Sequence, residues 1–244
     1  MDVRIIGLRG VPEIQPGDDI AARLRDAARR QNQALAADTI VAVAQKIVSK
    51  AEGAVVDLRT IEPSAFAAQW AREWGKDPRL IELVLRQARR IVKMDRGVLV
   101  AETHHGLVAA NAGVDQSNVA GEHAATILPP DPDASARRIR TGLGCGAVII
   151  TDTFGRPWRE GLVNVAIGVS GLEAVEDLRG TMDASGRSLQ ATVIALADEL
   201  AAAAGLVMRK DAGIPAALIF GALWRAAEGS GRTLIRDPQR DLFR

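Results

Sequence analysis

The sequence predicts an α+β protein with mixed sheets and flanking helices, and two observations lead to this fold class. Short β-branched runs typical of strands occur in groups along the chain. Amphipathic runs typical of helices do not alternate with them one by one, as a doubly wound α/β fold requires. We therefore expect one domain over residues 1–244, or two intertwined α+β subdomains that share a core.

The elements of the N-terminal half follow from apolar periodicity and turn residues. We expect strands over residues 3–8, 39–44 and 54–58, with a polar turn over 45–53 that pairs the last two. A helix begins at Ile20, behind a cap at Asp18 or Asp19. Two amphipathic helices over 64–74 and 78–92 meet at residues 75–77. Their solvated face would carry Arg86, Arg89 and Arg90.

The C-terminal half is predicted in the same way. Apolar runs indicate strands over residues 97–102, 107–110, 147–150 and 216–220. A short helix is expected over 133–141, and the longest helix of the chain over 190–208. The glycine cluster GLGCG at 142–146 leads into a strand and opens no helix, so it is weak support for a nucleotide-binding loop.

Composition excludes several function classes. The chain has 48% hydrophobic and 25% charged residues, which is globular, and no apolar run is long enough to cross a bilayer. The start MDVRIIGLRG lacks a secretory signal pattern, so we expect a cytoplasmic protein. A net charge of +1 from 31 basic and 30 acidic residues disfavours nucleic acid as a partner. The single cysteine, Cys145, is expected to be a buried small hydrophobe without chemistry, and three histidines do not suggest zinc.

The most informative stretch is IITDTFGRPWRE at residues 149–160, where an apolar run gives way to polar residues that core packing does not require. Asp152 and Thr153 offer oxygen ligands, and Arg156 and Arg159 follow as guanidinium groups that bind phosphates or carboxylates bidentately. Alone, such residues are also ordinary turn formers.

A second polar cluster, NAGVDQSN at residues 111–118, has the same arrangement and carries Asp115, Ser117 and Asn118. Two carboxylates about 4 Å apart repel by roughly 4 kcal/mol at an effective dielectric of about 20. If the fold brings Asp115 and Asp152 together, one must be protonated or a cation must lie between them. Hard oxygen ligands without thiolates favour magnesium or manganese.

A phosphate site must be assembled from separated pieces, because the chain has no Walker A motif. The candidate pieces are VPEI at 11–14, QKIVSK at 45–50 and MRKDAGIP at 208–215. Each has a plainer interpretation. Lys46 and Lys50 read as ordinary surface charges, Met208 as a core residue, and His105 as a structural hydrogen-bonding partner.

Taken together, the motifs resemble those of the coenzyme F-420:L-glutamate ligase family, also called F-420-0:γ-glutamyl ligase. The resemblance rests on VPEIQPGDD, QKIVSKAEG, HGLVAANAGVDQSN, LPPDPDASA and ITDTFGRPWREG in this order, and continues through MRKDAGIP and LIRDPQRDLFR. It implies an α+β, butterfly-like homodimer without the C-terminal flavin domain of some fusion members. The implied activity uses GTP, two magnesium or manganese ions and potassium to add glutamate to the lactyl carboxylate of the deazaflavin coenzyme precursor. The number of glutamates added is left open.

The resemblance also implies roles for individual residues. Asp115 and Asp152 would bind one metal ion, and Thr153 would help to bind the second. The GTP site would be lined by Val11, Pro12, Glu13, Ile14, Gln45, Lys50 and Asn118. A turn would close over the nucleotide, and it consists of Met208, Arg209, Lys210, Asp211, Ala212, Gly213, Ile214 and Pro215.

Two positions depart from the family pattern. Gln45 stands where serine or threonine is common, and Lys210 falls where some members carry a metal-binding glutamine. A charged lysine has no lone pair for a metal ion. These departures keep two alternatives open: a metal-dependent phosphohydrolase, and a non-catalytic protein that binds a deazaflavin or a nucleotide.

Overall fold

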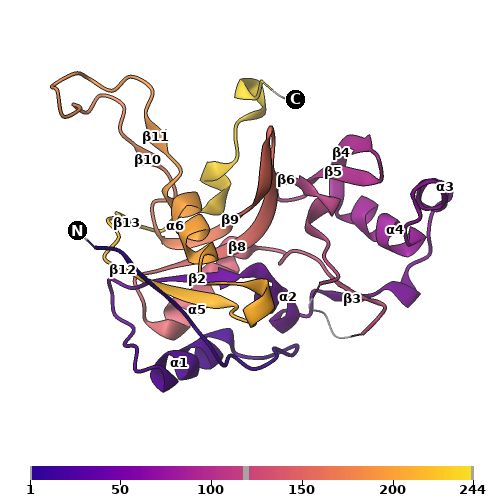
Figure 1. Ribbon diagram of the computed structural model, residues 1–244, viewed down its shortest axis with the longest axis horizontal. Helices are drawn as coiled ribbons and strands as arrows, with labels where there is room; N and C mark the ends of the chain where they lie inside the picture. The colour runs from indigo at the N-terminus through magenta and orange to yellow at the C-terminus, as the bar shows by residue number, and fades with distance from the viewer. Residues whose placement is uncertain (1, 118–120, 243–244) are drawn as a thin grey trace.

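A six-stranded mixed sheet forms the centre of the computed structural model, which describes residues 2–117 and 121–242 (Figure 1). In spatial order its strands are β1 (Arg4–Gly7), β12 (Ala216–Phe220), β2 (Ile40–Ala44), β8 (Ala147–Arg156), β9 (Arg159–Leu172) and β13 (Ala226–Ala227). β2 and β8 run parallel, and the other neighbouring pairs are antiparallel. The predicted α+β class with mixed sheets is confirmed.

Helices cover both faces of this sheet because the strands are apolar on both sides. Val41 and Val43 of β2 face one core, while Ile40 and Ala42 face the other. The first core is closed by α1 (Ile20–Arg30), α2 (Gln45–Ala51) and α5 (Pro132–Leu143), and the second by α6 (Leu196–Gly205). The Asp19 side chain caps α1 by accepting the N–H of Ala22 at 3.0 Å.

A third core lies beside the main sheet, at the right of Figure 1. It includes the buried side chains of Leu58, Leu99 and Ala125. The elements around it are β3 (Val55–Asp57), α3 (Ala65–Trp74), α4 (Pro78–Gln87), β4 (Ala88–Asp95), β5 (Val98–Thr103), β6 (Val108–Ala110) and β7 (Ala124–Thr126). β4, β5 and β6 form a three-stranded sheet, and β3 pairs with β7.

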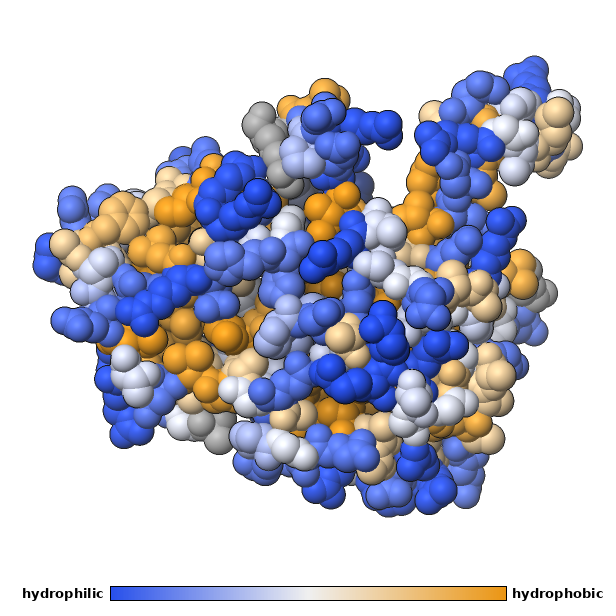
Figure 2. Space-filling view, turned by 180° about the vertical axis from the view of Figure 1, so that it is seen from behind, coloured by the Kyte–Doolittle hydropathy of each residue, from blue (hydrophilic) through white to orange (hydrophobic). Residues whose placement is uncertain are grey.

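A long hairpin built on β10 (Glu176–Asp177) and β11 (Val193–Ile194) projects from the body (Figure 1). Figure 2 shows the molecule from behind, with the hairpin again clear of the body and hydrophilic residues over most of the visible surface. Of the helices in the described ranges, none has the length and apolarity that crossing a membrane requires.

Two predictions for residues 45–58 are wrong. The predicted polar turn is the helix α2, whose Ile47 and Val48 side chains pack into the first core. Its N-cap, Ala44, makes no side-chain hydrogen bond, so the usual sequence sign of a helix start is missing. The following strand, β3, pairs with β7 rather than β2, because β2 already lies between β12 and β8.

The predicted helix over residues 78–92 is too long. α4 ends at Gln87, and β4 begins at Ala88 because Ile91 and Met94 pair with Ala101 and Leu99 of β5. Arg89 and Arg90, predicted to be solvated, also form ion pairs with Glu102. Their guanidinium groups lie 3.5 and 2.7 Å from the carboxylate of Glu102, a side chain that is only 4% exposed.

Two further boundaries differ from the prediction. The predicted longest helix is α6, with 10 residues, and is shorter than α5, with 12. Val193 and Ile194, expected inside it, belong to β11. The strand predicted over 147–150 extends to Arg156, so Asp152 lies within β8 and not in a turn after it.

Candidate active site

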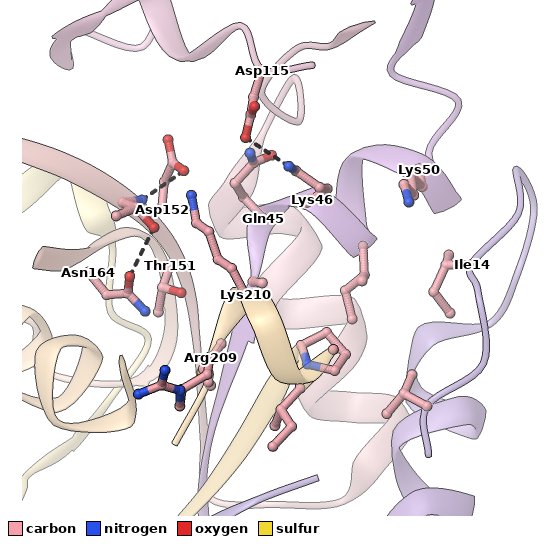
Figure 3. Close-up of a pocket in the computed structure, with 18 of the residues that line it drawn as sticks. Ile14, Gln45, Lys46, Lys50, Asp115, Thr151, Asp152, Asn164, Arg209 and Lys210 are labelled. Atoms are coloured by element: carbon pink, nitrogen blue, oxygen red, sulfur yellow. Dashed lines mark hydrogen bonds and ion pairs between the residues drawn. The ribbon is translucent and has the colours of Figure 1, made fainter. Parts of the chain in front are cut away.

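A cavity of about 280 Å³ lies at the ends of β2 and β8, beside α2 and the short 3₁₀ turn η3 (Lys210–Ala212) (Figure 3). It collects residues from six separate parts of the sequence. Its lining consists of Val11, Pro12, Glu13, Ile14, Ala44, Gln45, Lys46, Ile47, Lys50, Asp115, Thr151, Asp152, Thr153, Asn164, Met208, Arg209, Lys210, Gly213, Ile214 and Pro215.

Asp152 points into this cavity from β8. A bulge lies directly before it, because Ile150 pairs with Gly168 of β9 whereas Thr151 pairs with Ala166. Bulges next to active sites commonly redirect side chains. Asp152 Oδ1 accepts the backbone N–H of Thr153 at 2.8 Å. Burial raises the pKa of this carboxyl to about 6; the Thr153 N–H opposes the shift, and the negative charge of Asp115 adds to it.

Asp115 is placed by a strained turn and a strand contact. Asn111, Ala112 and Gly113 all have positive φ, at 53°, 50° and 73°. A Cβ atom at position 113 would lie 2.7 Å from Leu128 Cγ, so this position needs glycine for space as well as for conformation. The backbone of Asp115 then pairs with Thr126, through N–H···O contacts of 3.0 and 2.8 Å. Strain of this kind tends to occur at functional sites.

The carboxylate of Asp115 accepts hydrogen bonds from Lys46 and Ser117. Lys46 Nζ lies 2.7 Å from Asp115 Oδ2, and it also donates to the backbone oxygen and hydroxyl of Ser117. The Ser117 N–H and hydroxyl donate to Asp115 at 2.7 and 2.9 Å. Burial pushes the pKa of Asp115 upward, but the Lys46 and Ser117 hydrogen bonds outweigh it, so that the pKa is lowered.

The two aspartates therefore face one cavity, with opposite pKa shifts. Asp115 has an ion-pair partner in Lys46. Asp152 has no lysine or arginine within ion-pair distance among the residues that the structure describes. The charges of Lys210 and Lys46 still act on it and offset part of the rise in its pKa. A pair of unlike carboxylates of this kind is typical of functional sites.

The oxygen atoms around this pair fit a magnesium or manganese ion. Thr151, Thr153 and Asn164 add hydroxyl and amide oxygens beside the two carboxylates, with Thr153 Oγ1 donating to Asn164 Oδ1 at 3.0 Å. In the described part of the chain no cluster of three or more His, Cys, Asp and Glu side chains could hold a metal. Magnesium does not require one, because it is bound through one or two carboxylates, with water and substrate phosphates completing its shell.

The helix α2 directs three polar side chains at the cavity. Gln45 is buried, and its Oε1 accepts the hydroxyl of Ser49 at 2.8 Å. Lys46 and Lys50 lie four residues apart on the same face of the helix. Lys50 Nζ lies 2.5 Å from Glu13 Oε1. Figure 3 shows Lys50 on the side of the cavity opposite Asp152.

Apolar side chains form another part of the cavity wall, against which a flat organic ring of a ligand could pack. They are Val11, Pro12, Ile14, Ile47, Met208, Ile214 and Pro215. The cavity therefore combines carboxylates and ammonium groups with an apolar surface.

Most of the predicted site residues line this one cavity, although the chemistry assigned to each stays a prediction. Asp211 and Ala212 belong to η3 but do not line the cavity. Arg156 and Arg159 lie at the exposed tip of the β8–β9 hairpin, and Arg156 donates to the backbone oxygen of Glu160. Asn118 lies outside the described residues.

The expected structural roles of His105 and Cys145 are confirmed. His105 Nε2 lies 2.9 Å from the backbone oxygen of Pro129. Cys145 is buried, and burial raises the pKa of its thiol to about 11, so it is no thiolate nucleophile at neutral pH.

Sequence reasoning missed several lining residues. Lys46 was expected at the surface, yet its side chain is only 15% exposed and bound to Asp115. The signal that could have found it is its spacing of four from Lys50 on a helix. Asn164 could be found only from the sheet register, which places it opposite Thr153. Other lining residues without a predicted role are Ala44, Ile47 and Thr151.

The fold and the cavity define a class of protein: an α+β protein whose cavity offers oxygen ligands for a hard cation, ammonium groups for phosphates and an apolar wall. The family model described as F420-0:Gamma-glutamyl ligase matches residues 9–221. The chain belongs to this family of ligase enzymes, as its motifs predict.

Curated relatives agree over almost the whole chain. The coenzyme F420:L-glutamate ligase of Methanothermobacter thermautotrophicus is 45% identical, with 100% of both chains covered. The protein of the same name from Methanopyrus kandleri is 44% identical over 95% of this chain and 94% of its own. The one from Archaeoglobus fulgidus is 38% identical over 100% and 97%.

Proposed function

We propose that this protein is a GTP-dependent ligase that adds one or more L-glutamate residues to the lactyl carboxylate of the coenzyme F420 precursor. Its ions would be magnesium or manganese, with potassium. The observation that carries the proposal is the cavity in which Asp115 and Asp152 share one end with Lys46 and Lys210. The family match and the names of the relatives support glutamate and the deazaflavin precursor as substrates.

Amide formation from a free carboxylate needs an activated intermediate, because oxide is a poor leaving group. The precursor's carboxylate oxygen attacks the γ-phosphorus of GTP, the bond to the β-phosphate oxygen breaks, and GDP leaves. The product is an acyl phosphate. The amine of glutamate then attacks its carbonyl carbon, phosphate leaves, and the amine loses a proton to solvent. Such transfers depend on positioning and charge stabilisation.

A divalent ion between the aspartates would withdraw charge from the transferring phosphoryl group. Asp115 and Asp152 would hold this ion, and the Thr153 N–H orients the Asp152 carboxylate by donating to its Oδ1. Lys46, bound to Asp115 in this structure, lies where it can bind phosphoryl oxygens instead once Asp115 binds a cation. We assign phosphate binding to Lys46 and Lys210, since Arg156 and Arg159 lie outside the cavity lining.

The Glu13–Lys50 pair supports guanine as the base. Guanine presents an amino donor beside a carbonyl acceptor, and a carboxylate next to an ammonium group matches that pattern. Adenine reverses the pattern, with an amino group in place of the carbonyl. The pair lies on the side of the cavity away from Asp152, so that a nucleotide can direct its phosphates towards the aspartates (Figure 3).

We also propose that two copies of the chain form a homodimer. Trp158 and Leu162 at the β8–β9 hairpin are 80% and 69% exposed, and aromatic residues such as Trp are enriched at protein interfaces. Light scattering should give twice the chain mass for the wild type, and Trp158→Ser should shift the protein towards monomer. A monomeric wild type would contradict the dimer.

The test of the function is a comparison of GTP turnover with and without glutamate, in the presence of the deazaflavin precursor and manganese. A ligase sustains GDP release only with glutamate, since without it the reaction stops after one acyl phosphate per site, and ATP gives far less product. Equal phosphate release without glutamate would identify a phosphohydrolase, and binding of GTP with no release of GDP would identify a non-catalytic binding protein.

A further inference from the structure

Lys210 carries an ammonium group into the aspartate end of the cavity. It belongs to η3 (Lys210–Ala212), the turn that precedes β12, and its side chain extends towards Asp152 (Figure 3). The neighbouring Arg209 also lines the cavity, but it forms two hydrogen bonds with Asp211, at 3.0 and 2.7 Å. The charge of Arg209 is therefore already balanced by a carboxylate of its own turn.

The charges that face Asp152 come from three elements. Asp115 supplies a negative charge from the segment after η2 (Asn111–Gly113), Lys46 a positive charge from α2, and Lys210 a positive charge from η3. Lys46 is bound to Asp115 at 2.7 Å. Of the two lysines, Lys210 acts on the Asp152 carboxylate more strongly than Lys46 does. Two carboxylates thus meet two ammonium groups, and this end of the cavity is neutral before any metal binds.

We propose that the Lys210 ammonium group is the fixed second cation of this site, and that the chain therefore binds one divalent ion per cavity rather than two. This inference rests on the proposed function, in which a divalent ion lies between Asp115 and Asp152. A charged lysine has three donors and no lone pair, so it cannot ligate a metal. Its charge also repels a second ion from the Asp152 side.

The same charge gives Lys210 a role towards the nucleotide. An ammonium group fixed on a turn at the cavity edge can donate to a phosphoryl oxygen and stabilise the charge that develops there. One ion held by two carboxylates and by phosphate oxygens satisfies the coordination that magnesium prefers. The second cation of the site then belongs to the protein and is present at any metal concentration.

The experiment counts bound ions directly. Isothermal titration calorimetry of Mn²⁺ into the protein saturated with GDP measures the stoichiometry, and electron paramagnetic resonance of free Mn²⁺ checks it. The wild type should bind one ion per chain. Lys210→Gln replaces the ammonium group by a neutral side chain with an oxygen ligand, and should bind two. Because residue 210 is exposed, the variant should fold.

Two control variants separate charge from position. Lys210→Arg keeps the positive charge and should still bind one ion. Arg209→Gln removes the adjacent charge, which Asp211 balances, and should also bind one. Two ions on the wild type or on Lys210→Arg, or one on Lys210→Gln, would overturn the inference and leave the ligase proposal standing. If no Mn²⁺ binds to the wild type at all, the proposed metal site itself fails.

Discussion

Replacement of Asp152 by asparagine should make the metal-free protein more stable at neutral pH while it removes activity. Burial raises the pKa of Asp152 from 3.8 to about 6. The folded state therefore holds this proton more tightly than the unfolded chain does. The stabilisation of the folded state by this proton is fully present below the unfolded pKa of 3.8, and it is lost as the pH rises from 3.8 to about 6. Asparagine is neutral at all of these pH values and avoids the loss.

The size of the effect follows from the two pKa values. One pKa unit corresponds to about 1.4 kcal/mol, so the free energy of unfolding of the wild type should fall, relative to the variant, by on the order of 2 kcal/mol between about pH 4.5 and 7.5. Asparagine has nearly the shape of aspartate, and its Oδ1 can still accept the N–H of Thr153. The core is not otherwise changed.

The measurement is urea unfolding of both proteins at a series of pH values in the presence of a metal chelator. Asp115→Asn is the matched control, because hydrogen bonds from Lys46 and Ser117 lower the pKa of Asp115. Loss of that charge leaves Lys46 without its carboxylate partner, so this variant should be less stable than the wild type at neutral pH, by about 1 kcal/mol. Both variants should lose metal-dependent turnover.

A difference in stability between Asp152→Asn and the wild type that stays constant from pH 4.5 to 7.5 would rule out a raised pKa of Asp152. A change of stability in the same direction for both aspartate variants would rule out their opposite pKa shifts. Opposite effects on the apo protein, combined with the same loss of activity, are specific to a carboxylate pair held in unlike environments.

Three further substitutions test other parts of the site. Lys46→Met should lower kcat by about 10²- to 10³-fold, because it removes a cation from the end of the cavity where we propose that phosphates bind. Steady-state kinetics with GTP measure this, and an unchanged kcat would exclude the role. Glu13→Gln should reduce the preference for GTP over ATP by about tenfold or more, as competing turnovers show, whereas an unaltered ratio would mean that other groups select the base. Gly113→Ala should destabilise the fold by about 2–4 kcal/mol, through positive φ and overlap with Leu128, and a denaturation midpoint equal to that of the wild type would contradict the strained turn.

The parts of the fold that the sequence predicts are those in which local pattern and tertiary packing agree. The apolar run at 216–220 matches β12 (Ala216–Phe220). Asp19 caps α1 at the point where a polar loop gives way to apolar residues at helical spacing. β2 begins one residue after the predicted start at Thr39. In these segments the same residues that favour the element also fill the core, so no competing structure is available.

The misplaced boundaries lie where no capping or breaking residue marks the change. Residues 88–92 continue the helical periodicity of α4, and only pairing with β5 turns them into a strand. The α2 helix starts without a side-chain cap, and α6 likewise starts at an Ala195 N-cap that makes none. Long-range pairing decides these cases, and a local pattern carries no information about it.

For the site, the motifs identified both aspartates but not the positive charges that balance them. Asp115 and Asp152 were expected to meet, and they line one cavity. That Lys46 would bind Asp115 depends on the placement of α2 beside the segment that carries Asp115 and Ser117, which no motif reveals. Arg156 was expected at the site because it follows Asp152 closely in sequence. It lies instead at the exposed tip of the β8–β9 hairpin, outside the cavity lining.

Mass spectrometry of the deazaflavin precursor after incubation with the protein, GTP, glutamate and manganese decides whether this chain is the proposed ligase. The expected product is heavier by at least one glutamyl residue, forms together with GDP, and is absent when Asp115→Asn or Asp152→Asn replaces the wild type. A precursor of unchanged mass, or full product formation by either aspartate variant at ordinary metal concentration, would contradict the proposed function.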